Sequence, residues 1–220
     1  MKYMIDSSNI EALKRINNFG LTQGVTTNPS ILAQVEENRF QQYLDIKSVS
    51  DGDLFVQLVG DDVDSMFEDY VLVSKFLKEN QISYVIKVPI NEIGLEVIRK
   101  IRLIHETERF LGTTIYTFHQ AVLAIHAGCD YLAPYYNRIA VEGEDPNVVI
   151  EDIRNYIEAY NYNCVILAAS LKTPQQVSDA LNHGAHTCTV SPELFFEMMR
   201  DDRVDRDIKK FNEDDASLPQ

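Results

Sequence analysis

Short runs of strand-forming residues recur along the whole chain, and stretches with helical spacing of their apolar residues lie between them. The eight runs are residues 3–6, 24–28, 54–59, 84–88, 109–113, 131–134, 164–169 and 187–190. Eight strand–helix units within 220 residues predict an α/β fold, a single-domain (β/α)8 TIM barrel. A doubly wound open sheet is the main rival, but it usually has fewer strands and a glycine-rich first turn that this sequence lacks.

Capping residues mark where two of the helices begin. Asn91 is expected to cap a helix over residues 92–104. Ser191 and Pro192 combine an N-cap with a proline at the first helical position, so the last helix of the barrel is expected to run through Met199.

These boundaries place the barrel domain at residues 1–200. The remaining segment, 201–220, mixes charged residues with Ile208 and Phe211. We expect it to be a solvated tail or a short helix that packs on another surface, such as a neighbouring subunit.

Composition and charge narrow the possible partners and location. A hydrophobic fraction of 45% is ordinary for one globular domain, and a net charge of −14 disfavours nucleic acid or an acidic membrane as a partner because both require a basic face. The three widely separated cysteines lack a CxxC spacing, which predicts reduced, packed thiols. The sequence shows no long apolar run and no signal-peptide layout, so we expect a cytoplasmic protein.

Lys87 is the one cation inside the apolar run 84–90, which otherwise has the pattern of a strand buried on both faces. Burying an ammonium group costs on the order of several kcal/mol unless the group is paired or loses its proton. A lysine that loses its proton attacks carbonyl groups and forms Schiff bases. The segment alone also allows a structural lysine whose amine reaches water at the strand end.

Polar side chains collect where seven of the eight predicted strands end, which favours the catalytic interpretation of Lys87. In a barrel these ends meet at one mouth, where the active site lies. The polar residues at these ends are Asp6, Thr26, Asn28, Gln57, Lys87, Thr113, Tyr135, Ser170 and Lys172.

Further candidates follow from charge and spacing. Asp6 either caps the first helix or moves protons while an imine forms. Arg138 and Lys172, together with Ser170, are expected to hold a phosphate by charge-assisted hydrogen bonds, although each alone is typical of a surface residue. The histidines show no metal-ligand spacing and no GxGxxG or P-loop motif is present, so we expect neither a metal nor another cofactor.

Five motifs together resemble the transaldolase family and, more narrowly, its fructose-6-phosphate aldolase subgroup. They are GVTTNPS at 24–30, IKVP at 86–89, LGT at 111–113, APYYNR at 133–138 and AASLKTP at 168–174. The resemblance runs from Tyr3 to the last helix and implies a metal-free class I aldolase with Lys87 as the Schiff-base lysine and Asp6 as the acid near it. It also implies that Thr26 and Asn28 contact donor hydroxyls, and that Arg138, Ser170 and Lys172 bind phosphate.

Two positions separate the subgroups of this family. Transaldolase-type members carry a glutamate on the third strand and a phenylalanine after the sixth, whereas this chain has Gln57 and Tyr135. A phenol can relay a proton to and from a water held by Gln57 and Thr113, which phenylalanine cannot do. The resemblance therefore implies reversible cleavage of fructose 6-phosphate to dihydroxyacetone and glyceraldehyde 3-phosphate.

Two other functions remain open at this stage. One is a transaldolase that moves a dihydroxyacetone unit between sugar phosphates of the pentose phosphate pathway; the other is a phosphosugar-binding barrel without turnover, in which Lys87 is structural. The expected small-molecule partners are a sugar phosphate and dihydroxyacetone. The resemblance also implies a homo-oligomer, a pentamer or a decamer of stacked rings, in which the C-terminal helix reaches a neighbour.

Overall fold

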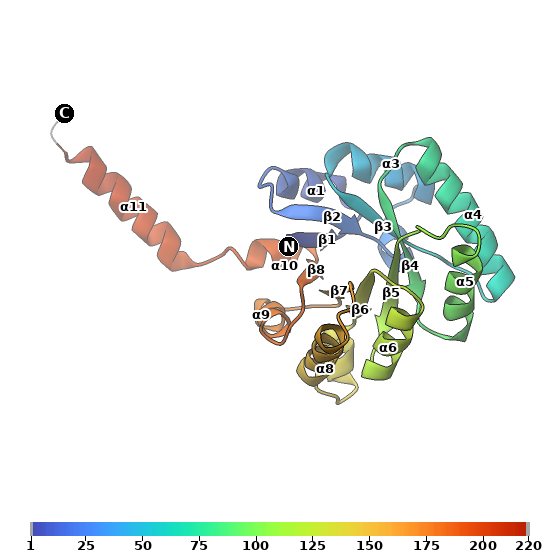
Figure 1. Ribbon diagram of the computed structural model, residues 1–220. Coiled ribbons are helices and arrows are strands. Elements are labelled where there is room, and N and C mark those ends of the chain that lie inside the picture. The colour runs from blue at the N-terminus through green and yellow to red at the C-terminus, as the bar shows by residue number, and fades with distance from the viewer. Residues whose placement is uncertain (1, 219–220) are drawn as a thin grey trace.

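The computed structural model describes residues 2–218, and its eight parallel strands form a closed barrel in sequence order (Figure 1). The strands are β1 (Tyr3–Asp6), β2 (Thr22–Thr26), β3 (Asp53–Gln57), β4 (Tyr84–Pro89), β5 (Phe110–Ile115), β6 (Tyr131–Pro134), β7 (Val165–Ala168) and β8 (Thr187–Val190). The last strand pairs with the first through Met4 and Thr189, which closes the sheet. The predicted (β/α)8 barrel is confirmed, and an open sheet is excluded.

Helices connect and cover the strands. Within residues 2–218 they are α1 (Ile10–Asn17), α2 (Pro29–Leu32), α3 (Arg39–Val49), α4 (Val63–Glu79), α5 (Glu92–Arg102), α6 (Phe118–His126), α7 (Tyr136–Val141), α8 (Pro146–Ala159), α9 (Pro174–Asn182), α10 (Pro192–Glu197) and α11 (Asp202–Ala216). Both predicted caps are confirmed, because the Asn91 side chain accepts a hydrogen bond from the Gly94 N–H and the Ser191 side chain accepts one from the Leu194 N–H.

Six predicted boundaries were wrong by two residues. β2 spans Thr22–Thr26 instead of 24–28, and β5 ends at Ile115 instead of residue 113. β3 ends at Gln57 instead of Val59, whose N–H donates to the Asp69 carboxylate rather than to a strand. α5 ends at Arg102 instead of residue 104. α10 ends at Glu197 instead of Met199. A tighter turn follows the helix, in which the Met199 N–H donates to the Phe196 carbonyl oxygen.

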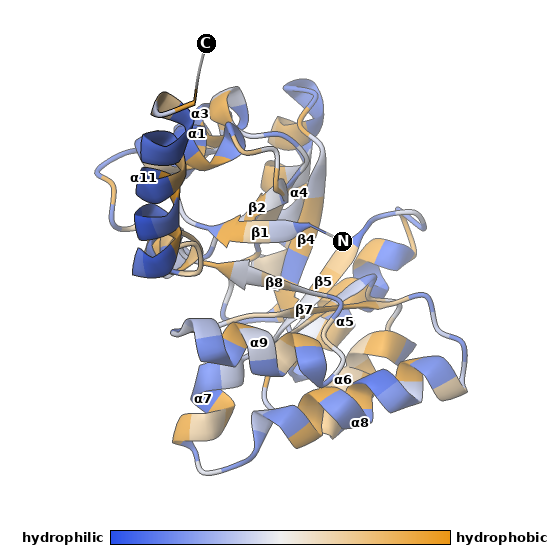
Figure 2. Ribbon diagram, turned by 90° about the vertical axis from the view of Figure 1, so that its left-hand side faces the viewer, coloured by the Kyte–Doolittle hydropathy of each residue, from blue (hydrophilic) through white to orange (hydrophobic). Residues whose placement is uncertain are grey.

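The C-terminal segment forms α11, a helix of 15 residues that projects away from the barrel (Figure 1). The expected solvated tail or short helix is therefore a longer helix, and residues 219–220 of that segment lie outside the described residues. α11 buries no residue within this chain and is largely hydrophilic (Figure 2), but Val204, Ile208 and Phe211 are exposed on it. In the described part of the chain, no helix has both the length and the apolar character needed to span a membrane.

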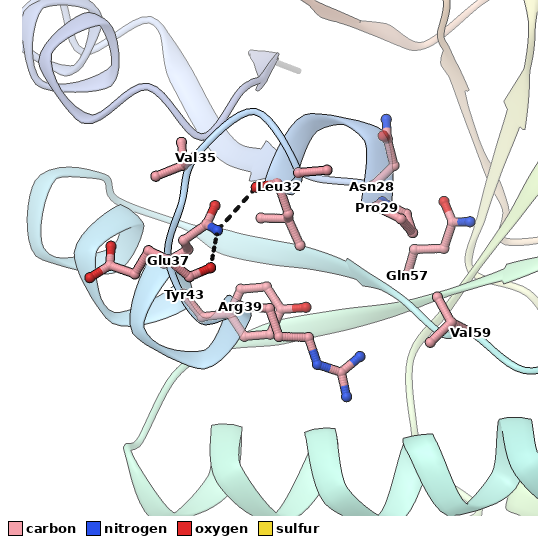
Figure 3. Close-up of a pocket in the computed structure, with 11 residues that line it drawn as sticks. Asn28, Pro29, Leu32, Val35, Glu37, Arg39, Tyr43, Gln57 and Val59 are labelled. Atoms are coloured by element: carbon pink, nitrogen blue, oxygen red, sulfur yellow. Dashed lines mark hydrogen bonds between the residues drawn. The ribbon is translucent and has the colours of Figure 1, made fainter.

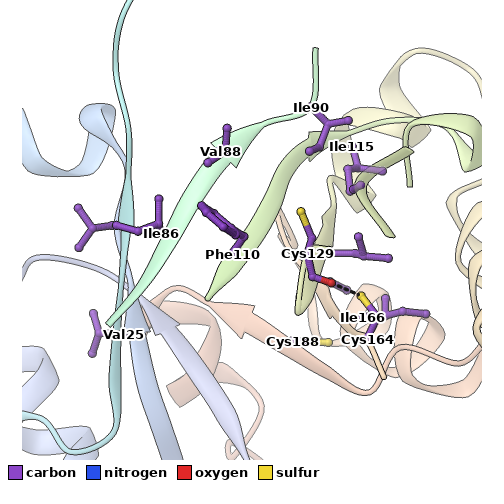
Figure 4. Close-up of a cluster of buried hydrophobic side chains, with 14 of the residues drawn as sticks. Val25, Ile86, Val88, Ile90, Phe110, Ile115, Cys129, Cys164, Ile166 and Cys188 are labelled. Carbon is purple, nitrogen blue, oxygen red and sulfur yellow. Dashed lines mark hydrogen bonds between the residues drawn. The ribbon is translucent and has the colours of Figure 1, made fainter. Parts of the chain in front are cut away.

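Apolar side chains form two separate cores. The larger core lies between the strands and the helices, and Figure 4 shows the part of it that contains the three cysteines, all of them free and buried. The smaller core fills the barrel interior and consists of Met4, Phe55, Val85, Leu111, Ala133, Leu167 and Ala169. Because side chains alternate along a strand, the residues two positions after Met4, Phe55, Val85, Leu111 and Ala133 also point inward, and they form the next layer toward the mouth.

Candidate active site

A polar layer lies directly on the apolar interior of the barrel and lines a cavity of about 400 Å³. All ten residues predicted for the site line this cavity. They are Asp6, Thr26, Asn28, Gln57, Lys87, Thr113, Tyr135, Arg138, Ser170 and Lys172. The eighth strand, for which no polar end was predicted, also contributes Thr189. The alternating pattern Thr187-Cys188-Thr189 was the signal in the sequence that could have identified it.

Lys87 reaches the cavity from the middle of the barrel wall. Lys87 lies two positions after the inward-facing Val85 on β4, so its side chain also points into the barrel, and the residue is only 5% exposed. Among residues 2–218, the hydrogen bond of its Nζ goes to the Thr27 carbonyl oxygen, at 2.7 Å, rather than to a carboxylate. Burial lowers the pKa of Lys87 below the usual 10.5, while the nearby charge of Asp6 partly opposes this shift. A lower pKa increases the fraction of the amine in its neutral, nucleophilic form.

Asp6 ends β1 and is held by the neighbouring strand. The Thr26 hydroxyl on β2 donates to its Oδ1 over 2.6 Å. Thr26 also lies 2.6 Å from the Thr189 hydroxyl on β8. The predicted alternative, in which Asp6 caps the first helix, is wrong, because the Asn9 side chain accepts the capping hydrogen bond from the Ala12 N–H.

Tyr135 and Thr113 form a hydroxyl pair on another side of the cavity, with their oxygens 3.0 Å apart. Burial raises the pKa of Tyr135 above 10.0, against the lowering effects of Thr113 and of the Arg138 guanidinium, which lies 4.8 Å from the ring centroid. The phenol is therefore protonated at neutral pH. Tyr136 points the other way, into the outer core, and its hydroxyl donates to Asn147.

The end of β5 contains a bulge that the sequence analysis missed. Its register against β6 shifts between Gly112 and Ile115, and Thr114 has a φ of 57°. This left-handed conformation is uncommon for a β-branched residue and costs about 1–3 kcal/mol. As a result Thr113 and Thr114 both line the cavity. Ser170, after β7, is similarly left-handed with a φ of 61°.

Asn28 and Gln57 line both this cavity and a second cavity of about 310 Å³. The second cavity is bounded by α2, the loop that follows α2 and the end of β3 (Figure 3). The Asn28 Oδ1 accepts a hydrogen bond from the Ile31 N–H and so caps α2. One lone pair of Oδ1 is thus occupied, and the side-chain amide nitrogen is the group that can donate to a ligand.

Positive charge lies at the rim of the cavity. Arg138 comes from the first turn of α7 and contacts the Tyr116 hydroxyl at 3.4 Å. Ser170 and Lys172 follow β7, and Lys172 is exposed. In a chain of net charge −14, two cations beside one hydroxyl form a site suited to an anionic group such as a phosphate.

The comparisons with known proteins agree with this geometry. A family model described as transaldolase/fructose-6-phosphate aldolase matches residues 3–219. A protein named "Probable transaldolase" from Streptococcus equi subsp. zooepidemicus strain H70 is 32% identical over 221 residues, covering 100% of both chains. Another of that name from Streptococcus pyogenes serotype M1 is 32% identical over 219 residues, covering 99% of each. The chain belongs to the transaldolase/fructose-6-phosphate aldolase family of aldolase-type enzymes.

Proposed function

We propose that the protein is a class I aldolase that reversibly cleaves fructose 6-phosphate to dihydroxyacetone and glyceraldehyde 3-phosphate. The observation that carries this proposal is the buried Lys87 amine in a cavity that also contains a protonated phenol paired with a hydroxyl, Tyr135 with Thr113. The amine supplies the nucleophile, and the phenol supplies the proton that a release reaction needs.

In the cleavage direction, Lys87 attacks the ketone carbon of the sugar and forms a carbinolamine. Asp6 donates a proton to the carbinolamine oxygen, which leaves as water and gives an iminium ion. The next carbon–carbon bond then breaks: its electrons move into the iminium to form an enamine. The adjacent hydroxyl gives its proton to the water beside Tyr135 as glyceraldehyde 3-phosphate departs.

Release of dihydroxyacetone requires a proton on the enamine carbon and water on the resulting iminium. We assign the proton to Tyr135, acting through a water that Gln57 and Thr113 hold. Gln57 lines the same cavity and Thr113 bonds the phenol oxygen, which supports this assignment. Asp6 takes up a proton again when the iminium is hydrolysed.

The remaining site residues bind the substrate. We assign the donor hydroxyls to Thr26 and Asn28, and the phosphate of the aldehyde product to Arg138 and Ser170, with Lys172 adding charge at the exposed rim. Guanidinium and hydroxyl groups bind phosphate oxygens by charge-assisted hydrogen bonds. These contacts position the substrate without specifying its whole carbon chain.

A transaldolase is the second candidate, and the name "Probable transaldolase" carried by the relatives favours it. Such an enzyme passes the enamine to an acceptor aldehyde instead of protonating it. The test is the release of dihydroxyacetone from fructose 6-phosphate with and without erythrose 4-phosphate. We expect release without an acceptor; strict dependence on erythrose 4-phosphate would identify a transaldolase instead.

A non-catalytic phosphosugar-binding barrel is the third candidate. Borohydride reduces an imine to a stable amine, so incubation with dihydroxyacetone and borohydride should add the mass of the reduced ketone to Lys87. We expect one adduct, located by peptide mass spectrometry. A chain that remains unmodified would eliminate both enzymatic candidates.

We also propose that the protein is a cytoplasmic homo-oligomer and that α11 packs on a neighbouring subunit. The support is that α11 buries nothing within its own chain while Ile208 and Phe211 remain 51% and 65% exposed. Deletion of residues 201–220 should therefore lower the number of subunits per particle, calculated from the mass measured by light scattering. An unchanged number of subunits would show that the helix is simply solvated.

A further inference from the structure

Three side chains form a hydrogen-bonded chain across the strands where the barrel closes. Thr189 of β8 contacts Thr26 of β2, and Thr26 contacts Asp6 of β1, each over 2.6 Å. Thr189 and Thr26 are only 5% and 1% exposed. Bulk water is therefore a poor substitute for either hydroxyl, and a change at Thr189 reaches Asp6 through Thr26.

The number of protons fixes the direction of these bonds. Each threonine hydroxyl has one proton, and an ionised carboxylate has none. Thr26 donates its proton to Asp6, so the short contact between the two hydroxyls requires Thr189 to donate to Thr26. Successive donors polarise one another, which strengthens the final hydrogen bond to the carboxylate.

The same three oxygens also suit a protonated Asp6. In that state Asp6 donates to Thr26, and Thr26 donates to Thr189. The reversal requires rotation of hydroxyl hydrogens only, without movement of a heavy atom. Thr189 is thus the donor for one protonation state of Asp6 and the acceptor for the other, as a carboxyl group that repeatedly gives and takes a proton requires.

We propose that Thr189 is a positioning residue for the Schiff-base chemistry and that it acts on Asp6 through Thr26. The proposal rests on the proposed function, in which Asp6 gives a proton to the carbinolamine oxygen as the carbon–oxygen bond breaks and the lysine nitrogen forms the double bond. Thr189 holds the Thr26 hydroxyl in the orientation that each protonation state of Asp6 needs. Loss of Thr189 therefore slows imine formation and hydrolysis rather than substrate binding.

Thr187 provides a matched control on the same strand. It is two residues before Thr189, is 2% exposed, and its hydroxyl donates to the Lys2 carbonyl over 2.9 Å. Thr187→Val and Thr189→Val each delete one buried hydroxyl from β8. Only Thr189→Val deletes a hydroxyl that is connected to Asp6 through the Thr26 hydroxyl.

The experiment measures the rate of borohydride-trapped imine formation at Lys87, together with kcat and KM for fructose 6-phosphate. In Thr189→Val we expect imine formation and kcat to fall roughly 3- to 10-fold, the effect of one hydrogen bond, with KM unchanged. Thr189→Ser should restore both rates, and Thr187→Val should keep them even if its melting temperature falls. Normal imine formation in Thr189→Val, or an equal loss in Thr187→Val, would overturn the proposal.

A double-mutant cycle tests the route through Thr26. The variant Thr26→Val/Thr189→Val should be no slower than Thr26→Val alone, because the first change already breaks the chain. Independent, additive losses would overturn the relay. If Thr189→Val does not fold, Thr189→Ala removes the same hydroxyl without adding bulk. Absence of any wild-type adduct would reject the proposed function itself, whereas a wild-type adduct with an unaffected Thr189 variant rejects only this role.

Discussion

The two ends of the barrel differ in how their charged side chains are paired. At the amino-terminal end, Arg109 makes two parallel hydrogen bonds to Asp53, at 2.7 and 2.8 Å, and a third to the Tyr84 carbonyl. At the carboxyl-terminal end, the Lys87 amine is more deeply buried, yet among the described residues it bonds only a carbonyl oxygen. Within residues 2–218, one end pairs its charges, and the other leaves the Lys87 amine without an ion-pair partner.

This difference separates stability from chemistry. A bidentate arginine–carboxylate pair satisfies both partners and stabilises the fold, whereas an amine without an ion-pair partner favours its neutral form and becomes reactive. The pKa values reflect the same contrast. Burial alone would raise the pKa of Asp53, but hydrogen bonds from Arg109 and Ser83 outweigh it and the pKa lies below 3.8; burial lowers that of Lys87.

Lys87→Met tests the reactive end and should have the largest effect. Turnover should fall by more than roughly 10⁴-fold, because the nucleophile is lost. The melting temperature should not fall, since an apolar side chain needs no desolvation of an ammonium group. Calorimetry alongside the assay checks both; a large loss of stability would mean that Lys87 is structural.

Tyr135→Phe deletes one hydroxyl at nearly constant volume. Release of dihydroxyacetone should fall by about 10²- to 10⁴-fold, the usual cost of losing a general acid–base group. Transfer to erythrose 4-phosphate should suffer less, because an aldehyde intercepts the enamine before protonation. The ratio of transfer to release should therefore rise, and more so with Gln57→Glu added. A constant ratio would place Tyr135 in a step that both reactions share.

Arg138→Ala tests the cationic rim. KM for glyceraldehyde 3-phosphate in the synthetic direction should rise roughly 10- to 100-fold, the worth of charged hydrogen bonds, with a smaller change in kcat. Unphosphorylated glyceraldehyde is the control substrate, and its KM should be unaffected. Lys172→Ala should raise KM for the phosphorylated aldehyde less, because this side chain is exposed. Equal losses with both aldehydes would argue against a phosphate site.

Asp53→Asn tests the paired end and should have the smallest effect. It should lower the unfolding free energy by about 1 kcal/mol near neutral pH and leave turnover unchanged. Because the pKa of Asp53 is lower in the folded state, its contribution is present above the unfolded pKa and is lost as the pH falls through the folded pKa. Denaturant titrations at about pH 7 and about pH 3 should thus show the difference from wild type shrinking in acid. A loss of activity would show that the two ends are coupled.

The sequence predicted most of the fold and ten of the residues that line the cavity, because period-two alternation places polar strand ends beside the apolar interior. The sequence could not predict the backbone conformation of Thr114, since a threonine gives no indication of a positive φ. Thr189 was missed because it precedes the last residue of its strand. The length of α11 and its separation from the barrel depend on contacts outside the local pattern, as do the hydrogen-bond partners of Lys87 and Asp6.

The closure of β8 on β1 has a consequence for the order of folding. The contact between Thr26 and Thr189 spans 163 positions of the sequence, and contacts of such separation form late because the intervening loop must first be ordered. Ribosomal synthesis delivers Asp6 and Thr26 long before Thr189. A nascent chain therefore contains Lys87 long before the hydrogen bonds from Thr189 through Thr26 to Asp6 can form. Catalytic competence thus arrives with the final strand.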